Sequence, residues 1–178
     1  MSETIDDFRT FYQPKAESEK VNLKELILKS IDFIDSAIQK KEIKVIKELE
    51  NIELKLYGNE FLQVIINLIK NAVDSMSKGG TIIIKLKKRE NQIVISIKDN
   101  GVGIDKELIT KVFDPYFTTK KDSMGLGLYM SKMIIERHLK GTIKIERLKK
   151  GTKFSIYLKA IREENYSPFI KNHPNSEK

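Results

Sequence analysis

Apolar residues recur every three or four positions in three stretches of the chain, which predicts three amphipathic helices. The first helix, over residues 22–38, opens with Asn22 and Glu25 at the spacing of a capping box. The second is expected over residues 59–77, where a glycine pair then ends the pattern, and the third over residues 126–139. Each predicted helix has one apolar stripe, so each is expected to cover another layer.

Alternation of apolar and polar residues predicts the strands of that other layer. The predicted strands are 43–49, 53–57, 81–88, 93–99, 142–148 and 152–159. The last four form two predicted hairpins, so the sheet is expected to be mixed and mostly antiparallel. The fold class is therefore α/β (α+β): a two-layer sandwich with about three helices on one face of the sheet.

The remaining segments give weaker patterns. Residues 3–12 have helix-like spacing that Pro14 stops, residues 105–112 suggest a short helix, and residues 113–124 read as a loop. We expect three parts: the end of a longer helix at 1–14, one folded domain at 15–161, and a polar C-terminal tail at 162–178.

Composition excludes several kinds of chemistry. The 178 residues include no cysteine, so disulfides, thiolate metal sites and cysteine nucleophiles are not available. The net charge of +8 would favour ATP, nucleic acid or an anionic membrane face without choosing among them. Because the lysines are dispersed and no known nucleic-acid-binding motif accompanies them, we expect no nucleic-acid partner. The apolar runs are far shorter than the roughly 20 residues of a membrane span, so we expect a cytoplasmic location without membrane contact.

The helix predicted at 59–77 carries a polar stripe on an otherwise apolar surface. Asn67, Asn71, Asp74 and Ser75 are spaced about one turn apart, and polar groups at such positions need partners. An asparagine oxygen suits Mg²⁺, which takes one or two protein oxygens and completes its shell with phosphate and water. Taken alone, the stripe fits a solvated helix side equally well.

Two glycine-containing turns add candidate ligand contacts. Asp99 follows directly on a predicted strand, in the sequence Asp-Asn-Gly-Val-Gly-Ile, and an adenine amino group is a donor that such a carboxylate could meet. An ordinary turn would also explain this sequence. Residues 125–128 open a predicted helix, whose free N–H groups attract phosphate. The loop between them can close over a ligand and present Lys120 or Lys121 to phosphate.

These segments together resemble the N, G1, F and G2 boxes of histidine kinases. In chain order they are Asn67-Leu-Ile-Lys-Asn71-Ala-Val-Asp74, Asp99-Asn-Gly-Val-Gly103, Phe113-Asp-Pro-Tyr-Phe117-Thr-Thr-Lys120 and Gly125-Leu-Gly-Leu128. Each motif alone is weak evidence, but four in this order and spacing indicate the ATP-binding catalytic domain of a histidine protein kinase. The resemblance covers about residues 1–160, since Thr4 to Tyr12 also look like the end of the second dimerisation helix of such kinases. It implies that residues 1–14 are the end of a dimerisation helix. It implies a Bergerat-type fold with an ATP lid, shared with type II topoisomerases and mismatch-repair ATPases.

The resemblance also implies roles for single residues. Asn71 would bind Mg²⁺, Asp99 would hold the adenine amino group, and Thr152 would assist Asp99 directly or through water. Phe113 and Phe117 would seat the lid, whose shape is expected to differ from that of relatives with Gly-Thr in place of Ser123-Met124. The full implied set of ATP-binding residues is Asn67, Lys70, Asn71, Asp74, Asp99, Gly101, Gly103, Ile104, Phe117, Thr118, Thr119, Lys120, Met124, Gly125, Leu126, Gly127, Leu128 and Thr152.

The implied activity is transfer of the γ-phosphate of Mg-ATP to a histidine. Neither His138 nor His173 stands in the usual His-Glu or His-Asp context, so the acceptor is expected on a preceding segment of the full protein or on another chain. The implied partners are the dimerisation and phosphoacceptor helices of the same kinase and a response regulator receiver domain. Asn67 stands where hydrolytic relatives place a glutamate that activates water, so we expect slow ATP hydrolysis.

Two other functions fit the same pocket. One is a nucleotide-responsive interaction module without phosphoryl transfer, and the other is a serine/threonine kinase of the anti-sigma-factor type. A P-loop enzyme is not expected, because the chain has no Gly-x-x-x-x-Gly-Lys-Ser/Thr stretch.

Overall fold

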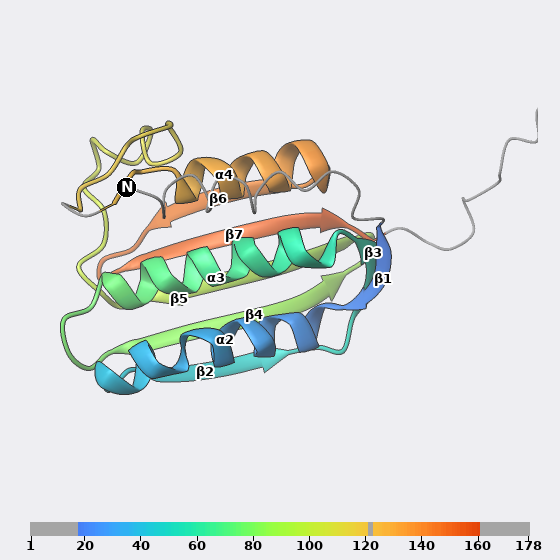
Figure 1. Ribbon diagram of the computed structural model, residues 1–178, viewed down its shortest axis with the longest axis horizontal. Helices are drawn as coiled ribbons and strands as arrows, with labels where there is room; N and C mark the ends of the chain where they lie inside the picture. Colours follow the sequence, from blue (N-terminus) through green and yellow to red (C-terminus); the bar gives the residue numbers. More distant parts are fainter. Residues whose placement is uncertain (1–17, 121–122, 161–178) are drawn as a thin grey trace, which may run out of the picture.

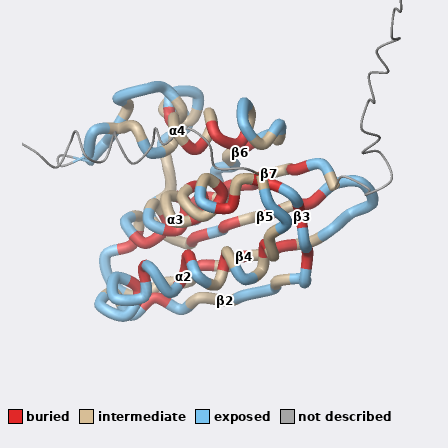
Figure 2. The backbone as a smooth tube through the Cα atoms, turned by 45° about the vertical axis from the view of Figure 1, so that its right-hand side comes forward, coloured by how far each residue is buried: buried red, intermediate tan, exposed pale blue. Residues whose placement is uncertain are grey.

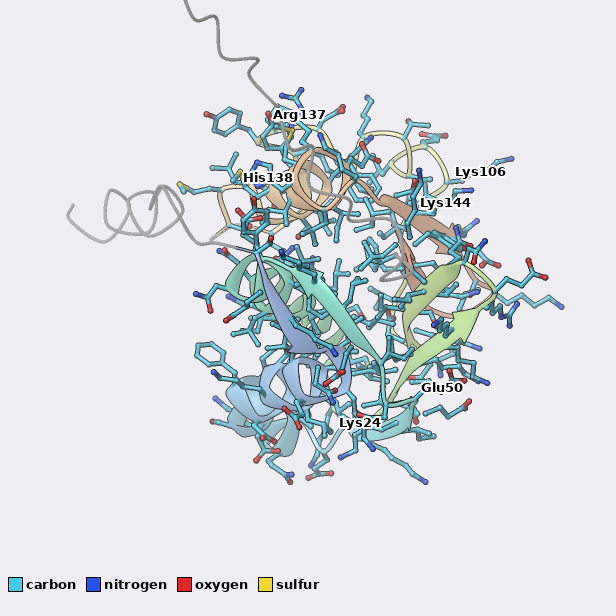
Figure 3. The ribbon with its side chains drawn as sticks, turned by 90° about the vertical axis from the view of Figure 1, so that its right-hand side faces the viewer. Lys24, Glu50, Lys106, Arg137, His138 and Lys144 are labelled. Atoms are coloured by element: carbon cyan, nitrogen blue, oxygen red, sulfur yellow. The ribbon has the colours of Figure 1, made fainter. Side chains whose placement is uncertain are left out.

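Two layers make up the computed structural model, which describes residues 18–120 and 123–160. Three helices cover one face of a five-stranded sheet (Figure 1). From the side, α2 and α3 lie to one side and the strands of the main sheet to the other (Figure 3). This confirms the predicted fold class. The segments 1–14 and 162–178, predicted as a helix end and a polar tail, lie outside the described residues.

The main sheet has the strand order β2-β4-β5-β7-β6. Its strands are β2 Lys44–Leu49, β4 Thr81–Arg89, β5 Gln92–Asp99, β6 Thr142–Arg147 and β7 Thr152–Lys159. Strand β2 runs parallel to β4, and every other neighbouring pair in this sheet is antiparallel. Both predicted hairpins, β4 with β5 and β6 with β7, are confirmed.

A second, two-stranded sheet was not predicted. Strand β3, Glu53–Leu56, lies outside the main sheet and pairs antiparallel with β1, Glu19–Asn22. Four residues are too short for β1 to show a clear alternation, so its sequence gave no strand signal. Asn22 ends β1 and caps the next helix, since its side chain accepts a hydrogen bond from the Glu25 N–H at 3.2 Å. The predicted capping position is thus confirmed.

The helices bury their apolar stripes against the sheet, as Figure 2 shows where buried stretches of the two layers face one another. Their bounds are α2 Leu23–Lys40, α3 Gly58–Asp74 and α4 Gly127–Met133. The alternating isoleucines of β4 and β5 point into this core, which confirms the assignment of the buried face. In the described part of the chain, no helix combines the length and apolar character needed to cross a membrane.

The short helix predicted at 105–112 is wrong. The chain instead makes consecutive turns. Each turn is closed by a 2.9 Å hydrogen bond from a backbone N–H to the carbonyl three residues earlier: Leu108 to Asp105, Lys111 to Leu108 and Asp114 to Lys111. Leu108 and Val112 have helix-like spacing, but both line a cavity described below. Both side chains therefore reach the cavity without a regular helix.

The helix predicted at 126–139 is present but changes type. It is α-helical to Met133 and continues as a π-helix, η1, over Ile134–His138. The neighbours Ile134 and Ile135 are both buried, and the Leu139 N–H reaches back five residues to the Ile134 carbonyl. A wider turn accommodates two adjacent apolar side chains on the inner side of the helix.

Candidate functional site

A cavity of about 530 Å³ lies between the end of α3, the end of β5 and the long segment that leads to α4. Its lining residues are Asn67, Asn71, Asp74, Ser75, Asp99, Val102, Gly103, Ile104, Asp105, Leu108, Val112, Phe117, Thr118, Thr119, Lys120, Ser123, Gly125, Gly127, Leu128, Thr152 and Phe154. One side is formed by residues of the helices and strands, and the other by loop residues 117–120, 123 and 125. The cavity is therefore enclosed partly by regular elements and partly by a loop.

A buried carboxylate, Asp99, lines this cavity, and we call the part of the lining around it the Asp99 end. Asp99, the last residue of β5, is 3% exposed, and its Oδ1 accepts hydrogen bonds from the Gly101 N–H at 2.9 Å and the Ser75 hydroxyl at 3.1 Å. Thr152 opens the adjacent strand β7 and is also buried. Fixed donors therefore hold the carboxylate in one orientation at the cavity wall.

The pKa of Asp99 is raised above the ordinary aspartate value of 3.8. Burial is the main cause, because removing the carboxylate from water disfavours its charged form. Hydrogen bonds from the Gly101 N–H, the Ser75 hydroxyl and the Thr152 backbone oppose this rise. The group therefore takes up a proton at a higher pH than an exposed aspartate does.

Glycines allow the backbone to approach this carboxylate closely. A Cβ atom at position 101 would overlap the Ser75 side chain and carbonyl, so the loop after β5 can pass the end of α3 only with glycine there. Gly151 has a φ of +87°, and a Cβ there would overlap the Asp99 carbonyl. Both positions need glycine for space, and Gly151 needs it for its backbone conformation as well.

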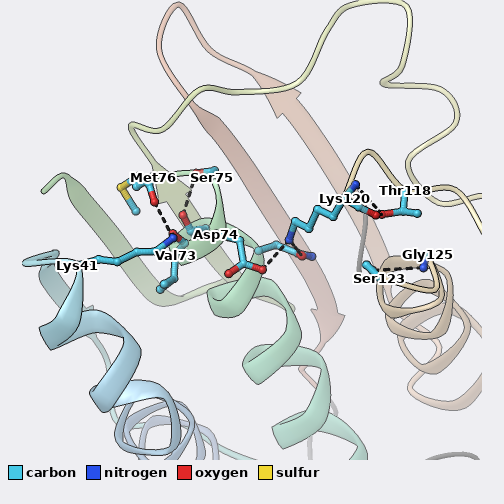
Figure 4. A network of polar contacts seen from close by, with 11 residues as sticks. Lys41, Val73, Asp74, Ser75, Met76, Thr118, Lys120, Ser123 and Gly125 are labelled. Atoms are coloured by element: carbon cyan, nitrogen blue, oxygen red, sulfur yellow. Dashed lines mark hydrogen bonds and ion pairs between the residues drawn. The ribbon is translucent and has the colours of Figure 1, made fainter. Parts of the chain in front are cut away.

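A second group of polar side chains, Asn71, Asp74 and Lys120, lines the cavity, and we call this part of the lining the Asn71 end. Asn71 and Asp74 lie in the last turn of α3, and Lys120 reaches them from the loop, as Figure 4 shows for Lys120 and Asp74. The Lys120 ammonium is 2.6 Å from Asp74 Oδ2 and 3.4 Å from Asn71 Oδ1. The Thr118 hydroxyl accepts the Lys120 N–H at 3.0 Å and so shapes the loop at this point.

Asn67 links α3 to the beginning of α4. Its side-chain N–H donates to the Ser131 hydroxyl at 2.9 Å, and that hydroxyl donates to the Gly127 carbonyl at 2.9 Å. Ser131 is 2% exposed, and a Cβ at position 127 would overlap the Asn67 amide. The Asn67 side chain therefore sets the distance between the two helices beside the cavity.

The loop over the cavity is anchored at both ends by short contacts. Phe113 packs edge-on against Phe154, with ring centroids 6.4 Å apart, while Phe117 lines the cavity. At the far end the Ser123 hydroxyl accepts the Gly125 N–H at 3.3 Å. Ser123, one of the two residues that depart from the family pattern, thus stabilises the turn into α4.

Four of the predicted ATP-binding residues do not line the cavity: Lys70, Gly101, Met124 and Leu126. Lys70 is exposed because it precedes Asn71 by one position, and one step on a helix rotates a side chain by about 100°. Gly101 acts through its backbone N–H on Asp99, and Met124 is 51% exposed. The other predicted residues line the cavity.

Sequence reasoning missed several residues of this region. Leu108, Val112 and Phe154 form apolar parts of the lining, and Ser131 supports Asn67 from outside it. The spacing of Leu108 and Val112 was a usable signal, since it indicated one buried side. Nothing local distinguishes Ser131 from a serine on an exposed helix face.

Oxygen donors at the Asn71 end fit a hard divalent cation. Asn71 offers an amide oxygen and Asp74 a carboxylate, and Mg²⁺ commonly uses one or two such protein ligands beside phosphate and water. Within residues 18–120 and 123–160, there is no group of three or more histidine, cysteine, aspartate or glutamate side chains that could hold a metal ion.

Sequence comparisons place the chain among known ATPases and kinases. The family model for histidine kinase-, DNA gyrase B-, and HSP90-like ATPase matches residues 58–162. Sporulation kinase A of Bacillus subtilis (strain 168) is 36% identical over 147 residues, which cover 81% of this chain and 24% of that kinase. Sensor histidine kinase ZraS of Salmonella typhimurium is 34% identical over 149 residues, covering 81% of this chain and 32% of ZraS. The chain thus spans about a quarter to a third of the length of these relatives.

Solved structures resemble the chain over most of its length. The nucleotide-free catalytic domain of histidine kinase ThkA aligns with a TM-score of 0.76 and 31% sequence identity, covering 82% of this chain and 97% of that domain. ThkA in complex with the response regulator protein TrrA aligns with a TM-score of 0.75 and 29% identity, covering 89% of this chain and 47% of the ThkA chain.

Proposed function

Because the chain belongs to the family of histidine kinase-, DNA gyrase B-, and HSP90-like ATPases, we propose that it is the ATP-binding catalytic domain of a two-component sensor histidine kinase. It binds Mg-ATP and donates the γ-phosphate to a histidine outside the domain. We assign this domain to residues 15–161, preceded by the end of a dimerisation helix at 1–14 and followed by a polar tail at 162–178.

The cavity with chemically different ends is the observation that carries the proposal. A buried carboxylate, Asp99, stands at one end, while Asn71, Asp74 and Lys120 stand at the other. A purine with an exocyclic amino group supplies a donor for the first end, and a polyphosphate supplies negative charge for the lysine and for a divalent cation at the second. ATP combines both groups in one molecule.

Individual residues then have defined tasks. Asp99 accepts a hydrogen bond from the adenine amino group, with Thr152 beside it, and Asn71 holds the Mg²⁺ that neutralises phosphate charge. Gly127 and Leu128 line the cavity at the start of α4, where backbone N–H groups lack helix partners. Phosphoryl transfer needs mainly positioning and charge neutralisation, which this set supplies.

The acceptor histidine comes from elsewhere. His138 is not among the cavity-lining residues; its exposed ring, labelled in Figure 3, contacts the Glu60 carboxylate at 2.9 Å. In the transfer step the bond from the γ-phosphorus to the ADP oxygen breaks and a bond to an imidazole nitrogen forms, with the imidazole proton released. We assign the acceptor to the dimerisation and phosphoacceptor helices of the same kinase. The structure of ThkA with a response regulator supports a receiver domain as the next recipient, and we place these steps in the cytoplasm.

Hydrolysis by this site is slow in the proposal. The Asn67 amide, which occupies the position one turn before Asn71, donates to Ser131 and cannot accept a proton from water. Without a positioned base at this point, the γ-phosphate is kept for an incoming imidazole.

Transfer of radiolabel tests the proposal directly. The chain is mixed with γ-labelled ATP, Mg²⁺ and the separately prepared phosphoacceptor helix hairpin of the same kinase. We expect acid-labile label on the hairpin, absent when the hairpin histidine is replaced by alanine and absent with the Asp99→Asn chain. Acid-stable label would indicate a serine/threonine kinase instead. Binding of ATP without any transfer to its own or a related hairpin would indicate a nucleotide-responsive module, and failure to bind ATP would overturn the proposal.

A further inference from the structure

The cavity proposed to receive a polyphosphate is lined by more negative than positive side chains. Its titratable lining consists of three carboxylates, Asp74, Asp99 and Asp105, and one ammonium, Lys120. With all of these groups ionised, the lining of the described cavity carries two net negative charges. Metal-free ATP, itself strongly negative, would therefore enter a cavity of its own sign.

The carboxylate of Asp74 is the one placed to act on phosphate. It lies in the last turn of α3 and shares Lys120 with Asn71, whereas Asp99 is buried and held by Gly101 and Ser75. Asp74 and Lys120 are partly exposed, at 33% and 44% of their side chains, so a mobile ion or ligand can reach them. The charge of Asp74 is thus available to repel or attract what enters at this end.

Lys120 neutralises Asp74 when no ligand is present. The 2.6 Å pair, drawn in Figure 4, connects the loop directly to α3. The nearby Lys41 cannot take this place, because its ammonium donates to the carbonyls of Val73 and Met76 at 2.9 and 2.7 Å. Among the residues lining the described cavity, Lys120 is the single basic side chain.

We propose that Asp74 is a specificity-determining residue that makes nucleotide binding depend on a divalent cation. An incoming polyphosphate competes with Asp74 for Lys120, and once Lys120 turns to the phosphates the carboxylate is left facing like charge. Only a nucleotide that brings its own cation meets an attractive site. This inference rests on the proposed function, since it names which form of the nucleotide the same site selects.

Calorimetry with metal-free and metal-loaded nucleotide tests this role. ATP is titrated into wild type and Asp74→Asn, once in EDTA and once in excess Mg²⁺. Removing the carboxylate frees Lys120 and removes the repulsion, so Asp74→Asn is expected to bind metal-free ATP on the order of tenfold more tightly. Its affinity for Mg-ATP is expected to stay equal or fall. The ratio of the two dissociation constants therefore shrinks about tenfold or more.

Two controls separate this effect from a general change of charge or fold. Glu107→Gln removes an exposed carboxylate of the loop region that does not line the cavity, and it should leave both affinities unchanged. Adenosine carries no phosphate, so its affinity should be equal for wild type and Asp74→Asn. Thermal unfolding checks that each variant is folded. Because the Asp74 side chain is partly exposed, Asp74→Asn is expected to fold.

The outcomes distinguish this inference from the proposed function. If wild type binds Mg-ATP and Asp74→Asn binds metal-free ATP within twofold of wild type, the selectivity role is overturned while the kinase proposal stands. If wild type binds neither form, the proposed function falls. Lys120→Gln gives an independent check. It should weaken binding of metal-free ATP less in wild type than in the Asp74→Asn background, because in wild type Lys120 must first leave Asp74. Equal losses in the two backgrounds would contradict the competition for Lys120.

Discussion

The two ends of the cavity hold their carboxylates in different ways. Asp99 is 3% exposed and accepts hydrogen bonds from a backbone N–H and a hydroxyl, both on segments fixed by the core. The Asp74 side chain is 33% exposed and pairs with the long side chain of Lys120, which comes from the loop. One carboxylate is fixed before any ligand arrives, and the other has a partner that it can exchange.

This difference assigns separate tasks to the two ends. A fixed acceptor needs little free energy to reorganise when a ligand binds, so it can select a base by its shape and its hydrogen-bond donors. An exchangeable ion pair responds to charge and so can tell a metal-loaded polyphosphate from a bare one. Changes at the fixed end are therefore expected to affect all adenine nucleotides and the stability of the fold, and changes at the other end to affect only phosphate- and metal-dependent binding.

The largest effect is expected from Gly151→Ala, which breaks the fixed end. The new Cβ would overlap the Asp99 carbonyl at a φ of +87°, so we expect a loss of about 3 kcal/mol or more in the free energy of unfolding, with loss of ATP binding. Gly79→Ala is the matched control. It also has a positive φ, +69°, but nothing lies near its Cβ, so it should cost only about 1 kcal/mol. Equal costs in urea unfolding would show that the close approach to Asp99 is unimportant.

Asp99→Asn should separate binding from stability at the same end. Loss of a hydrogen bond to a charged group predicts about 50-fold weaker binding of both ATP and ADP by calorimetry. Because burial raises the pKa of Asp99, the stability that this group contributes is present at low pH and is lost as pH rises through the folded-state pKa. The amide avoids that loss, so the free energy of unfolding at neutral pH should be unchanged or higher. A marked fall in stability with intact ATP binding would contradict this role.

Asn71→Ala tests the exchangeable end. Removing the amide oxygen should weaken the binding of Mg-ATP by about tenfold, since one of the few protein ligands of the cation is lost. Binding of adenosine should not change, because Asp99 and its donors are untouched. Equal weakening of Mg-ATP and adenosine would show that the two ends do not act separately.

The smallest effect expected is a pH dependence of nucleotide affinity. Asp99 must be ionised to accept the adenine amino group well, and its raised pKa means that protons compete at a higher pH than for an ordinary aspartate. Adenosine affinity should therefore fall as the pH is lowered from neutral towards the ordinary aspartate value of 3.8. Asp99→Asn should show no such fall. A flat profile for wild type would place the titration of Asp99 below this range.

Much of the fold was predictable because its signals are local. The isoleucines of β4 and β5 alternate, and the apolar stripe of α3 recurs every three or four residues, so the buried faces follow from neighbours in the sequence. The failed helix at 105–112 shows the limit of this reasoning. Leu108 and Val112 both line the cavity, but consecutive turns and not a helix place them there.

The amino-acid sequence by itself determined the layers of this protein and the order of its four motifs along the chain. Only the tertiary structure decided which charges meet. Asp74 and Lys120 are 46 positions apart, and their pairing depends on where the loop passes the end of α3. The link from Asn67 to Ser131 likewise joins two helices that are separate in sequence. The spacing of apolar residues over a few positions determines which side of a helix or strand is buried. A contact between two loops or helices instead depends on how all the intervening elements pack.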